Sequence, residues 1–461
     1  MNGDGLLLRD VECYPSPHQV DVRVRAGAVS EIGPHLPPAE DEFVVRGDGG
    51  ALLPGLADHH LHLAAMAAAD GSVDLSGVPR AGLRTAFAGA VVGEDGWLRA
   101  VGYDEVVHGD LDRSALDAHA GRVPVRVQHR SGALWVVNSA GLERLGDHEG
   151  AERAADGRAT GRLWRADAWL RGAIGGRRPS LRSVGARLSA YGVTHVADAT
   201  PDAGAAELVA DAVRRHELPQ HVMVMAAACP PTSVPRLSVG PVKLVVADHS
   251  LPALDDLGAW IRGAHADGRP VAVHCVTRTA LALTLAALDL VGGLEGDRVE
   301  HCAVADLAAA REVAARGVRV VTQPTLVALR GDDYWTRVEP EDRPDLWRYD
   351  GLLRAGVRVA PSSDAPYGNP DPWACLRAAR ERTTRSGRVL GPAERVAGEM
   401  VLRGMFSPLH DPGGPPRLIA PGAPADLVLL DRPLAEALLQ PDAEHVRATF
   451  IGGRVEYGDL G

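Results

Sequence analysis

Lysine is almost absent from this chain. Among its 461 residues, 49 are basic, and Lys243 is the only lysine. A coding bias toward arginine explains the general scarcity, but it does not explain why a single lysine is kept. A lysine amine can lose its proton, form a Schiff base or react with CO2, whereas a guanidinium cannot. Lys243 is therefore a candidate functional residue.

The chain also lacks three other features: an excess of positive charge, long apolar runs and an even number of cysteines. The net charge of -11 disfavours nucleic acid and anionic membranes as partners. No apolar run reaches the roughly 18 residues that a membrane helix needs, and residues 1–4 lack the basic start of a signal peptide. The cysteines are scattered and odd in number, which argues against a disulfide framework: Cys13, Cys229, Cys275, Cys302 and Cys375. We therefore expect a cytoplasmic protein that acts on a small molecule, and the sequence is compatible with a homodimer.

Strand patterns occur at both ends of the chain. Residues 20–25 alternate apolar and polar side chains with a period of two, and turn signals separate them from their neighbours. Residues 425–430 and 448–455 have the same character and follow a connector rich in proline and glycine at 411–416. We predict that residues 1–53 and 411–461 jointly form a composite β-sandwich.

The region between them alternates short apolar strands with amphipathic helices. Eight strands are predicted, at 52–58, 193–198, 222–225, 241–246, 270–274, 298–301, 318–321 and 357–360. Helices are predicted near 203–216, 253–266, 277–290, 305–316 and 344–355. This pattern predicts an α/β protein with a (β/α)8 TIM-like barrel, whose catalytic groups lie at the C-terminal ends of the strands. The first strand and its motif fall in residues 54–70 and the remainder in 178–410. Residues 71–177 do not fit the count, so we interpret them as an α/β insertion after the first barrel strand.

The end of the first predicted barrel strand carries two histidines with the spacing of a chelate. Side chains two apart on a strand point the same way, about 6.6 Å apart along the chain, so His60 and His62 are able to bind one ion. A histidine-rich strand end without any ligand is the alternative for an isolated pair. His59 is expected to face the opposite side.

Four more metal-competent groups fall at the ends of other predicted strands. Lys243 lies in the fourth strand, His274 ends the fifth, His301 ends the sixth and Asp364 follows the eighth. Each has an ordinary explanation when taken singly, such as a packed histidine, a solvated lysine or a helix cap. Six such groups at one rim of a barrel are hard to explain separately, and together they predict a metal centre.

These motifs resemble those of the metal-dependent amidohydrolase superfamily. The resembling segments are residues 54–62, 242–243, 271–275, 298–302 and 362–366, together with the two terminal strand regions. Within the insertion, residues 96–105 and 134–139 are similar to amidohydrolase family 3, the N-substituted formamide deformylase-like branch. The resemblance covers nearly the whole chain, in residue types, order and strand position.

The resemblance implies a role for each matched side chain. His60, His62 and Asp364 would bind one ion, His274 and His301 a second, and a carboxylated Lys243 would bridge the two. Zinc is favoured by the histidine-rich set, although manganese, iron or nickel also suit it. A single ion beside an unmodified Lys243 is the alternative.

The implied reaction is hydrolysis of a non-peptide C–N bond in a small amide, formamide or cyclic amide. Asp364 would move a proton from the activated water to the leaving nitrogen, so Asp364 and Lys243 are the expected catalytic residues. Deamination of a ring amidine at the same site is one alternative. A catalytically inactive scaffold is another, disfavoured because all six groups are present.

Other residues are weaker candidates. Cys275 and Cys302 follow ligand histidines, and we expect them to point away and pack in the core. Tyr334 and Trp335 lie in the aromatic-rich segment 331–350, which we interpret either as a loop that covers substrate or as a surface helix whose aromatics pack. His129 and Asn138 in the insertion are further candidates for substrate contact, with an ordinary loop network as the alternative.

Overall fold

The computed structural model describes residues 5–93, 95–146, 148, 150–175, 179–228, 233–248, 250–458 and 460. It divides into two compact units, residues 1–63 with 181–461 and residues 64–180. Both contain helices and β-sheets, so the chain has a mixed α/β fold. Within the described ranges, no helix has the length and apolar character needed to cross a membrane. Cys229 lies outside the described residues.

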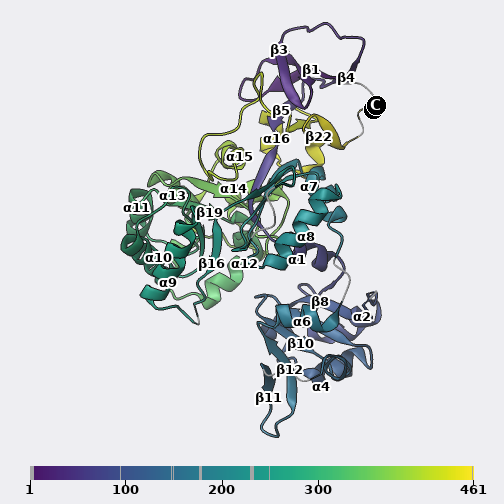
Figure 1. Ribbon diagram of the computed structural model, residues 1–461, viewed down its shortest axis with the longest axis vertical. Helices are drawn as coiled ribbons and strands as arrows, with labels where there is room; N and C mark the ends of the chain where they lie inside the picture. Colours follow the sequence, from purple (N-terminus) through teal and green to yellow (C-terminus); the bar gives the residue numbers. More distant parts are fainter. Residues whose placement is uncertain are drawn as a thin grey trace. The chain divides into compact units, whose positions relative to one another are not determined.

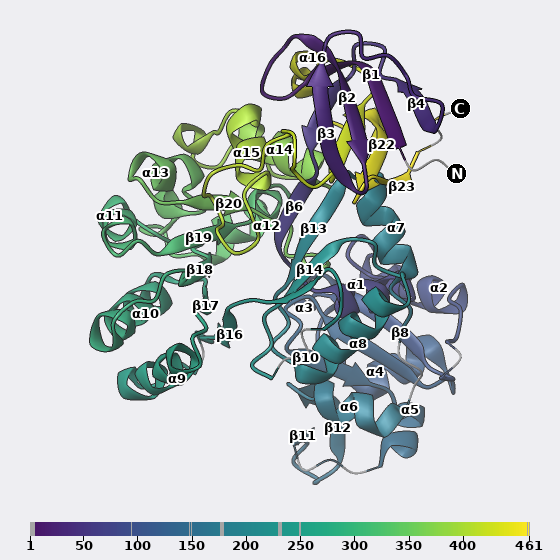
Figure 2. The same ribbon diagram turned by 45° about the horizontal axis from the view of Figure 1, so that its top comes forward.

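Strands from the two ends of the chain share one sheet in the first unit (Figure 2). The N-terminal strands are β1 (Gly5–Cys13), β2 (Gln19–Arg25), β3 (Ala28–Gly33), β4 (Glu42–Arg46) and β5 (Ala51–Pro54). The C-terminal ones are β21 (Leu427–Leu430), β22 (Val446–Ile451) and β23 (Arg454–Tyr457). The order is β23-β22-β21-β5-β1-β2-β3, with β4 beside β1, and β21 joins the two sets by pairing antiparallel with β5.

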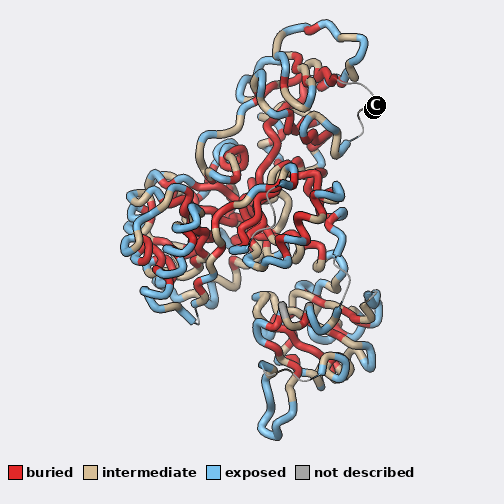
Figure 3. The backbone as a smooth tube through the Cα atoms, viewed as in Figure 1, coloured by how far each residue is buried: buried red, intermediate tan, exposed pale blue. Residues whose placement is uncertain are grey.

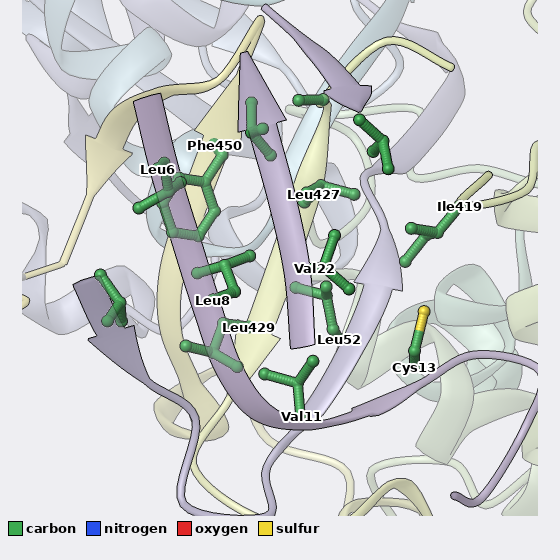
Figure 4. Close-up of a cluster of buried hydrophobic side chains, with 14 of the residues drawn as sticks. Leu6, Leu8, Val11, Cys13, Val22, Leu52, Ile419, Leu427, Leu429 and Phe450 are labelled. Carbon is green, nitrogen blue, oxygen red and sulfur yellow. The ribbon is translucent and has the colours of Figure 1, made fainter. Parts of the chain in front are cut away.

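The period-two pattern explains which side chains of this sheet are buried. Val22 and Val24 are buried on β2, whereas Arg23 between them and Arg25 after them are only partly covered. Inward side chains from both ends of the chain meet in one apolar cluster, which Figure 4 shows around Leu8, Leu52 and Phe450. Removal of this apolar surface from water stabilises the sheet by about 25 cal/mol per Å².

The central strands form two parallel sheets (Figures 1 and 2). One contains β6 (Leu56–Leu61), β13 (Val193–Asp198), β14 (His221–Val224) and β15 (Leu237–Val239). The other contains β16 (Val242–Val245), β17 (Val271–Cys275), β18 (Arg298–His301), β19 (Arg319–Thr322) and β20 (Val359–Pro361). Backbone hydrogen bonds join the two sheets, from Lys243 N to Met225 O at 2.9 Å and from Asp364 N to His60 O at 2.8 Å. Among the described residues, the strand ladders do not merge into a single closed sheet.

The predicted strand at 52–58 is wrong in its extent, because it is two strands. Pro54 ends β5 in the composite sheet, and β6 begins at Leu56 in the parallel sheet. Gly55 lies at the break, where an added Cβ would lie 2.1 Å from Thr194 Oγ1. Only glycine allows so close an approach to β13, so the chain changes sheets at this residue.

Helices connect most of the parallel strands of the first unit, and others precede or follow these strands. They are α7 (Arg182–Ala190), α8 (Ala203–Arg214), α9 (Leu254–Ala266), α10 (Arg278–Val291), α11 (Leu307–Ala315), α12 (Pro324–Arg337), α13 (Tyr349–Arg354), α14 (Pro372–Glu381), α15 (Gly398–Met405) and α16 (Leu434–Leu439). Side chains of Asp202, Thr277 and Asp306 cap α8, α10 and α11 by accepting backbone N–H groups. The tube of Figure 3 is red along the central strands and paler on the outer helices, so the strands form the core.

The second unit is built around a six-stranded sheet of its own. Its order is β11 (Ala151–Arg153), β12 (Ala159–Trp164), β10 (Leu134–Val137), β9 (Val125–His129), β8 (Leu98–Tyr103) and β7 (Val73–Asp74). The helices in this part of the chain are α1 (Leu63–Asp70), α2 (Leu83–Ala88), α3 (Glu105–His108), α4 (Arg113–Ala120), α5 (Ser139–Leu145) and α6 (Asp167–Ile174). Fully buried side chains such as Val125 and Val136 give the unit its own core.

Candidate metal centre

Three of the six predicted ligands converge on one point. His60 on β6 and His62 just after it place their Nε2 atoms 3.4 Å and 3.3 Å from Asp364 Oδ1. One donor atom from each of these side chains lies within 4.8 Å of the others. Asp364 follows β20, and its backbone hydrogen bond to His60 fixes the two segments side by side. The arrangement brings together the two predicted chelating histidines and a carboxylate.

The other three predicted groups adjoin this cluster. Lys243 is buried on β16, and its Nζ lies 3.5 Å from His60 Nε2. The ring centre of His301 on β18 is 5.0 Å from that of His60 and 4.5 Å from that of His274 on β17. Five of the six side chains lie at or just beyond the C-terminal parts of parallel strands, where enzymes of this architecture carry their catalytic groups. Lys243, the second residue of β16, lies beside them.

The orientation of the histidines suits metal binding through Nε2. His60 Nδ1 donates to Glu300 Oε2 at 2.5 Å, and His301 Nδ1 donates to Gln323 Oε1 at 2.7 Å. Each of these acceptors fixes the proton on Nδ1 and leaves a lone pair on Nε2, the tautomer that metal ligands adopt. His62 Nδ1 lies 3.1 Å from Thr200 Oγ1, a contact that allows the same tautomer.

The electrostatic environment keeps these groups in their metal-binding forms. Burial, reinforced by the charge of Lys243, lowers the pKa of His60 to about 3. Burial and His301 lower the pKa of His274 to about 2. Burial alone would raise the pKa of Asp364, but hydrogen bonding to His62 and the nearby histidines hold it below its usual value. Burial also lowers the pKa of Lys243, against the opposing effect of Glu300 and Asp364. His60 and His274 are thus neutral imidazoles at neutral pH, and Asp364 is an ionised carboxylate.

Two site residues adopt a backbone conformation that is rare for residues with a side chain. The φ angles of His301 and Asp364 are 71° and 55°, in the left-handed region. Such conformations cost of order 1–3 kcal/mol each and concentrate at functional sites. Around Asp364 the turn is supported by a hydrogen bond from Tyr367 N to its carbonyl oxygen at 2.8 Å. The fold therefore holds both residues in place at a cost in stability.

Four residues of this site were not predicted from the sequence: Thr200, Arg298, Glu300 and Gln323. A signal for two of them was present, because Arg298 and Glu300 are charged residues two apart in the predicted strand 298–301. Such residues share one face of the strand and, if buried, must be paired. Arg298 Nε donates to Glu300 Oε1 at 2.6 Å, and neither side chain is exposed.

His59 and the two cysteines point away from the cluster, as predicted. His59 Nε2 lies 3.1 Å from Ser407 Oγ, in a buried contact. Cys275 is buried, with its Sγ 3.2 Å from Thr284 Oγ1 on α10, and burial raises its pKa to about 12. Cys302 is also buried, and burial raises its pKa as well. Both cysteines are thiols that pack in the core.

The segment around Tyr334 and Trp335 is a helix, so the interpretation of this part as a loop is wrong. Pro324 occupies the first turn of α12, where its missing N–H is not needed, and the helix continues to Arg337. Tyr334 packs against Trp347, with ring centres 5.9 Å apart. The ring of Trp335 lies beside two guanidinium groups, those of Arg343 at 5.0 Å and Arg388 at 4.4 Å. These contacts match the alternative of aromatics packing a helix.

His129 and Asn138 have polar partners within the second unit. Asn138 is buried and caps α5, since its Oδ1 accepts from Gly141 N at 2.9 Å and its Nδ2 donates to Val123 O at 2.8 Å. His129 Nε2 lies 2.7 Å from Glu105 Oε2, and its Nδ1 lies 2.7 Å from Ser131 Oγ. These contacts correspond to the ordinary loop network, and substrate contact by either residue stays a prediction.

A second group with metal-ligand chemistry lies elsewhere in the first unit. Donor atoms of His195, His221 and Asp426 lie within 4.8 Å of one another. Arg417 Nη1, however, is 2.9 Å from His195 Nδ1. Because a guanidinium only donates, His195 Nδ1 must accept, and the proton of the neutral ring is then on Nε2. This group is therefore a hydrogen-bonded network in which His195 has no free lone pair for an ion.

The arrangement of the first cluster defines a class of protein: an α/β protein with a metal-ligand set at the ends of parallel strands. Comparison with known proteins specifies the family. The model of the amidohydrolase family matches residues 47–457. The match covers most of the chain, which therefore belongs to this family, and the family predicted from the motifs is confirmed.

Individual relatives support the same assignment. The N-substituted formamide deformylase of Arthrobacter pascens is 29% identical over 205 residues, which cover 42% of this chain and 38% of that enzyme. The match thus spans well under half of the curated relative. Among solved structures, a metal-dependent hydrolase from Pyrococcus horikoshii covers 96% of this chain and 99% of its own, with a TM-score of 0.77 and 20% identity. The N-isopropylammelide isopropylaminohydrolase of Burkholderia multivorans covers 98% and 97%, with a TM-score of 0.55 and 18% identity. At these identities, the structural matches show that the fold is shared.

Proposed function

We propose that this protein is a metal-dependent hydrolase that cleaves a non-peptide C–N bond of a small amide, formamide or cyclic amide. The observation that carries the proposal is the convergence of His60 Nε2 and His62 Nε2 on Asp364, with the Nδ1 proton of His60 held by Glu300. Neutral imidazole nitrogens and a hard carboxylate oxygen form a donor set that zinc and similar divalent ions prefer. Membership of the amidohydrolase family supports the reaction class.

The proposed centre holds two zinc ions. His60, His62 and Asp364 would hold one ion, His274 and His301 would hold the other, and Lys243, once carboxylated, would supply oxygen donors to both. In this proposal, the two parallel sheets form the (β/α)8 barrel, with the six ligands at its C-terminal rim. Location in the cytoplasm and assembly as a homodimer stay predictions from the sequence.

Lys243 is suited to carboxylation. Burial lowers its pKa, which favours the neutral amine that reacts with CO2. In that reaction the nitrogen forms a bond to the CO2 carbon and loses a proton, and the product carries two oxygen donors. A buried lysine next to His60, and the only lysine in the chain, is the residue expected for this modification.

Asp364 is the proposed proton carrier. Bound divalent ions supply Lewis acidity and bring the pKa of a bound water toward neutrality. Asp364 is ionised, because its neighbouring histidines hold its pKa low, so it can accept a proton from the attacking water. As the C–N bond breaks, Asp364 returns this proton to the leaving nitrogen. The water oxygen forms the new bond to the carbonyl carbon, and the products are a carboxylic acid and an amine.

The test is a hydrolysis screen of zinc-reconstituted protein. Formamides, acyl amides and cyclic amides are incubated with wild type and with Asp364→Asn, and the released amine or acid is measured. Turnover by wild type that Asp364→Asn lacks would support the proposal. Ammonia release from ring amidines alone would favour the deaminase alternative. Retention of zinc without turnover of any class would favour the inactive scaffold.

A further inference from the structure

A buried ion pair lies next to the metal-ligand cluster, in contact with His60. Arg298 and Glu300 lie two apart on β18, and the side chains of both are fully buried. One oxygen of Glu300 accepts from Arg298 Nε at 2.6 Å and the other lies 2.5 Å from His60 Nδ1. Arg298 Nη2 also donates to His59 O at 3.1 Å. Glu300 is therefore fixed between a permanent cation and a ligand imidazole.

Burial of this ion pair costs stability, so we expect the pair to serve another purpose. Removal of two charges from water costs several kcal/mol per ion, and well-packed apolar residues often replace such a pair without loss of stability. A carboxylate that accepts from the Nδ1–H of a ligand histidine orients the ring and makes its Nε2 a stronger donor. Arg298 compensates the buried negative charge, so that Glu300 is ionised when it accepts from His60.

Three of the candidate ligand histidines differ in the group that lies at hydrogen-bond distance from Nδ1. For His60 this group is the anionic carboxylate of Glu300, whereas for His301 it is the neutral amide of Gln323 and for His62 it is the hydroxyl of Thr200. The carboxylate of Asp364 also lies with His60 and His62. The two carboxylates, Glu300 and Asp364, thus both lie beside His60, and no carboxylate accepts from the Nδ1 of His301.

Resting on the proposed function, we propose that Glu300 and Arg298 are a positioning pair that makes the ion at His60, His62 and Asp364 the tighter of two bound ions. Glu300 acts through His60 and does not itself touch an ion or substrate.

The experiment is a zinc titration of metal-stripped, full-length protein against a chromophoric chelator, in the presence of bicarbonate. Wild type is compared with Glu300→Gln, with the double variant Arg298→Met/Glu300→Gln, and with Glu394→Gln. Glu394 is a matched control because it is also buried and paired with an arginine, Arg348 Nε at 3.0 Å, and its other oxygen accepts from a backbone N–H. Thermal unfolding of each metal-free variant is measured in parallel.

We expect wild type to bind zinc in two classes. Glu300→Gln should weaken the tighter class by about 10–100-fold, the usual effect of removing such a partner, and leave the weaker class within about threefold. The double variant should regain thermal stability, because neither charge is left unpaired, but not the tight class. Glu394→Gln should keep both classes.

Three results would overturn the inference: a tight class that Glu300→Gln leaves unchanged, an equal loss in both classes, or recovery of tight binding in the double variant. If Glu300→Gln does not fold, the double variant alone decides: loss of the tight class supports the inference, and retention of the tight class overturns it. A wild-type protein that binds no zinc would overturn the proposed function itself, and this failure is distinguishable because it involves no substitution at Glu300.

Discussion

Acidification should destabilise the metal-free protein. Burial lowers the pKa of His59 and of His60 to about 3, and that of His274 to about 2. In the unfolded chain the same imidazoles titrate near their ordinary value of 6.5. Between these values the unfolded state binds more protons than the folded state. The stabilising contribution is therefore present above pH 6.5 and is lost as the pH falls toward 3.

The magnitude follows from these values. Each histidine costs about 1.3 kcal/mol between pH 7 and pH 5.5, so the three together cost about 4 kcal/mol. Burial raises the pKa of Asp58 to about 6, and this carboxyl opposes the loss by about 0.8 kcal/mol, because its folded form takes up a proton in the same interval. These four groups together give a net loss of about 3 kcal/mol. An unfolding entropy of about 2.1 cal/mol/K per residue over 461 residues converts it to a fall of about 3 °C in Tm.

Scanning calorimetry of metal-free protein at pH 7 and pH 5.5, at equal ionic strength, tests this reasoning. His59→Gln is the informative variant, because His59 contacts Ser407 and points away from the ligand cluster. Its Tm should fall by about two fifths less than that of wild type between the two pH values. A wild-type Tm that is unchanged or higher at pH 5.5 would refute the argument, as would a pH dependence that His59→Gln leaves intact.

Three substitutions extend the test to other parts of the molecule. Lys243→Arg keeps the charge but removes the amine that reacts with CO2, so elemental analysis should find at least one ion fewer per chain; full zinc content would argue against the bridge. Asp364→Asn should lower kcat by about 10²–10⁴-fold on any substrate found without changing the far-ultraviolet circular dichroism, and wild-type turnover would exclude Asp364 as proton carrier. Phe450→Ala, in the fully buried core of the composite sheet, should lower the free energy of unfolding by about 3–5 kcal/mol, whereas its zinc content should equal that of wild type. Loss of zinc in the folded Phe450→Ala protein would contradict the expectation that the core of the composite sheet does not affect zinc binding.

Much of the candidate site could be predicted because its residues have short-range signals. The i, i+2 spacing of His60 and His62 fixes their common direction on a strand, and the uniqueness of Lys243 needs no structure to be noticed. Most of the parallel strands were predicted from apolar runs, since strands buried on both faces have few polar positions, whereas the short strand β15 (Leu237–Val239) was not predicted.

The remaining features depend on contacts between distant parts of the chain. The assignment of β5 and β6 to different sheets depends on the approach of Gly55 to Thr194, 139 positions further along the chain. The role of Glu300 depends on His60, a partner on a different strand. For the segment around Tyr334 and Trp335 the sequence left a loop and a helix open, and the structure shows a helix, α12, with Tyr334 packed against Trp347.

The metal content per chain tests the central claim most directly. Protein purified without chelators or a histidine tag, and a sample reconstituted with zinc and bicarbonate, would be measured by elemental mass spectrometry beside His60→Ala and His274→Ala. The account predicts close to two ions per wild-type chain and a clear loss in both variants. A wild-type value near zero after reconstitution, or full metal content in both variants, would contradict it.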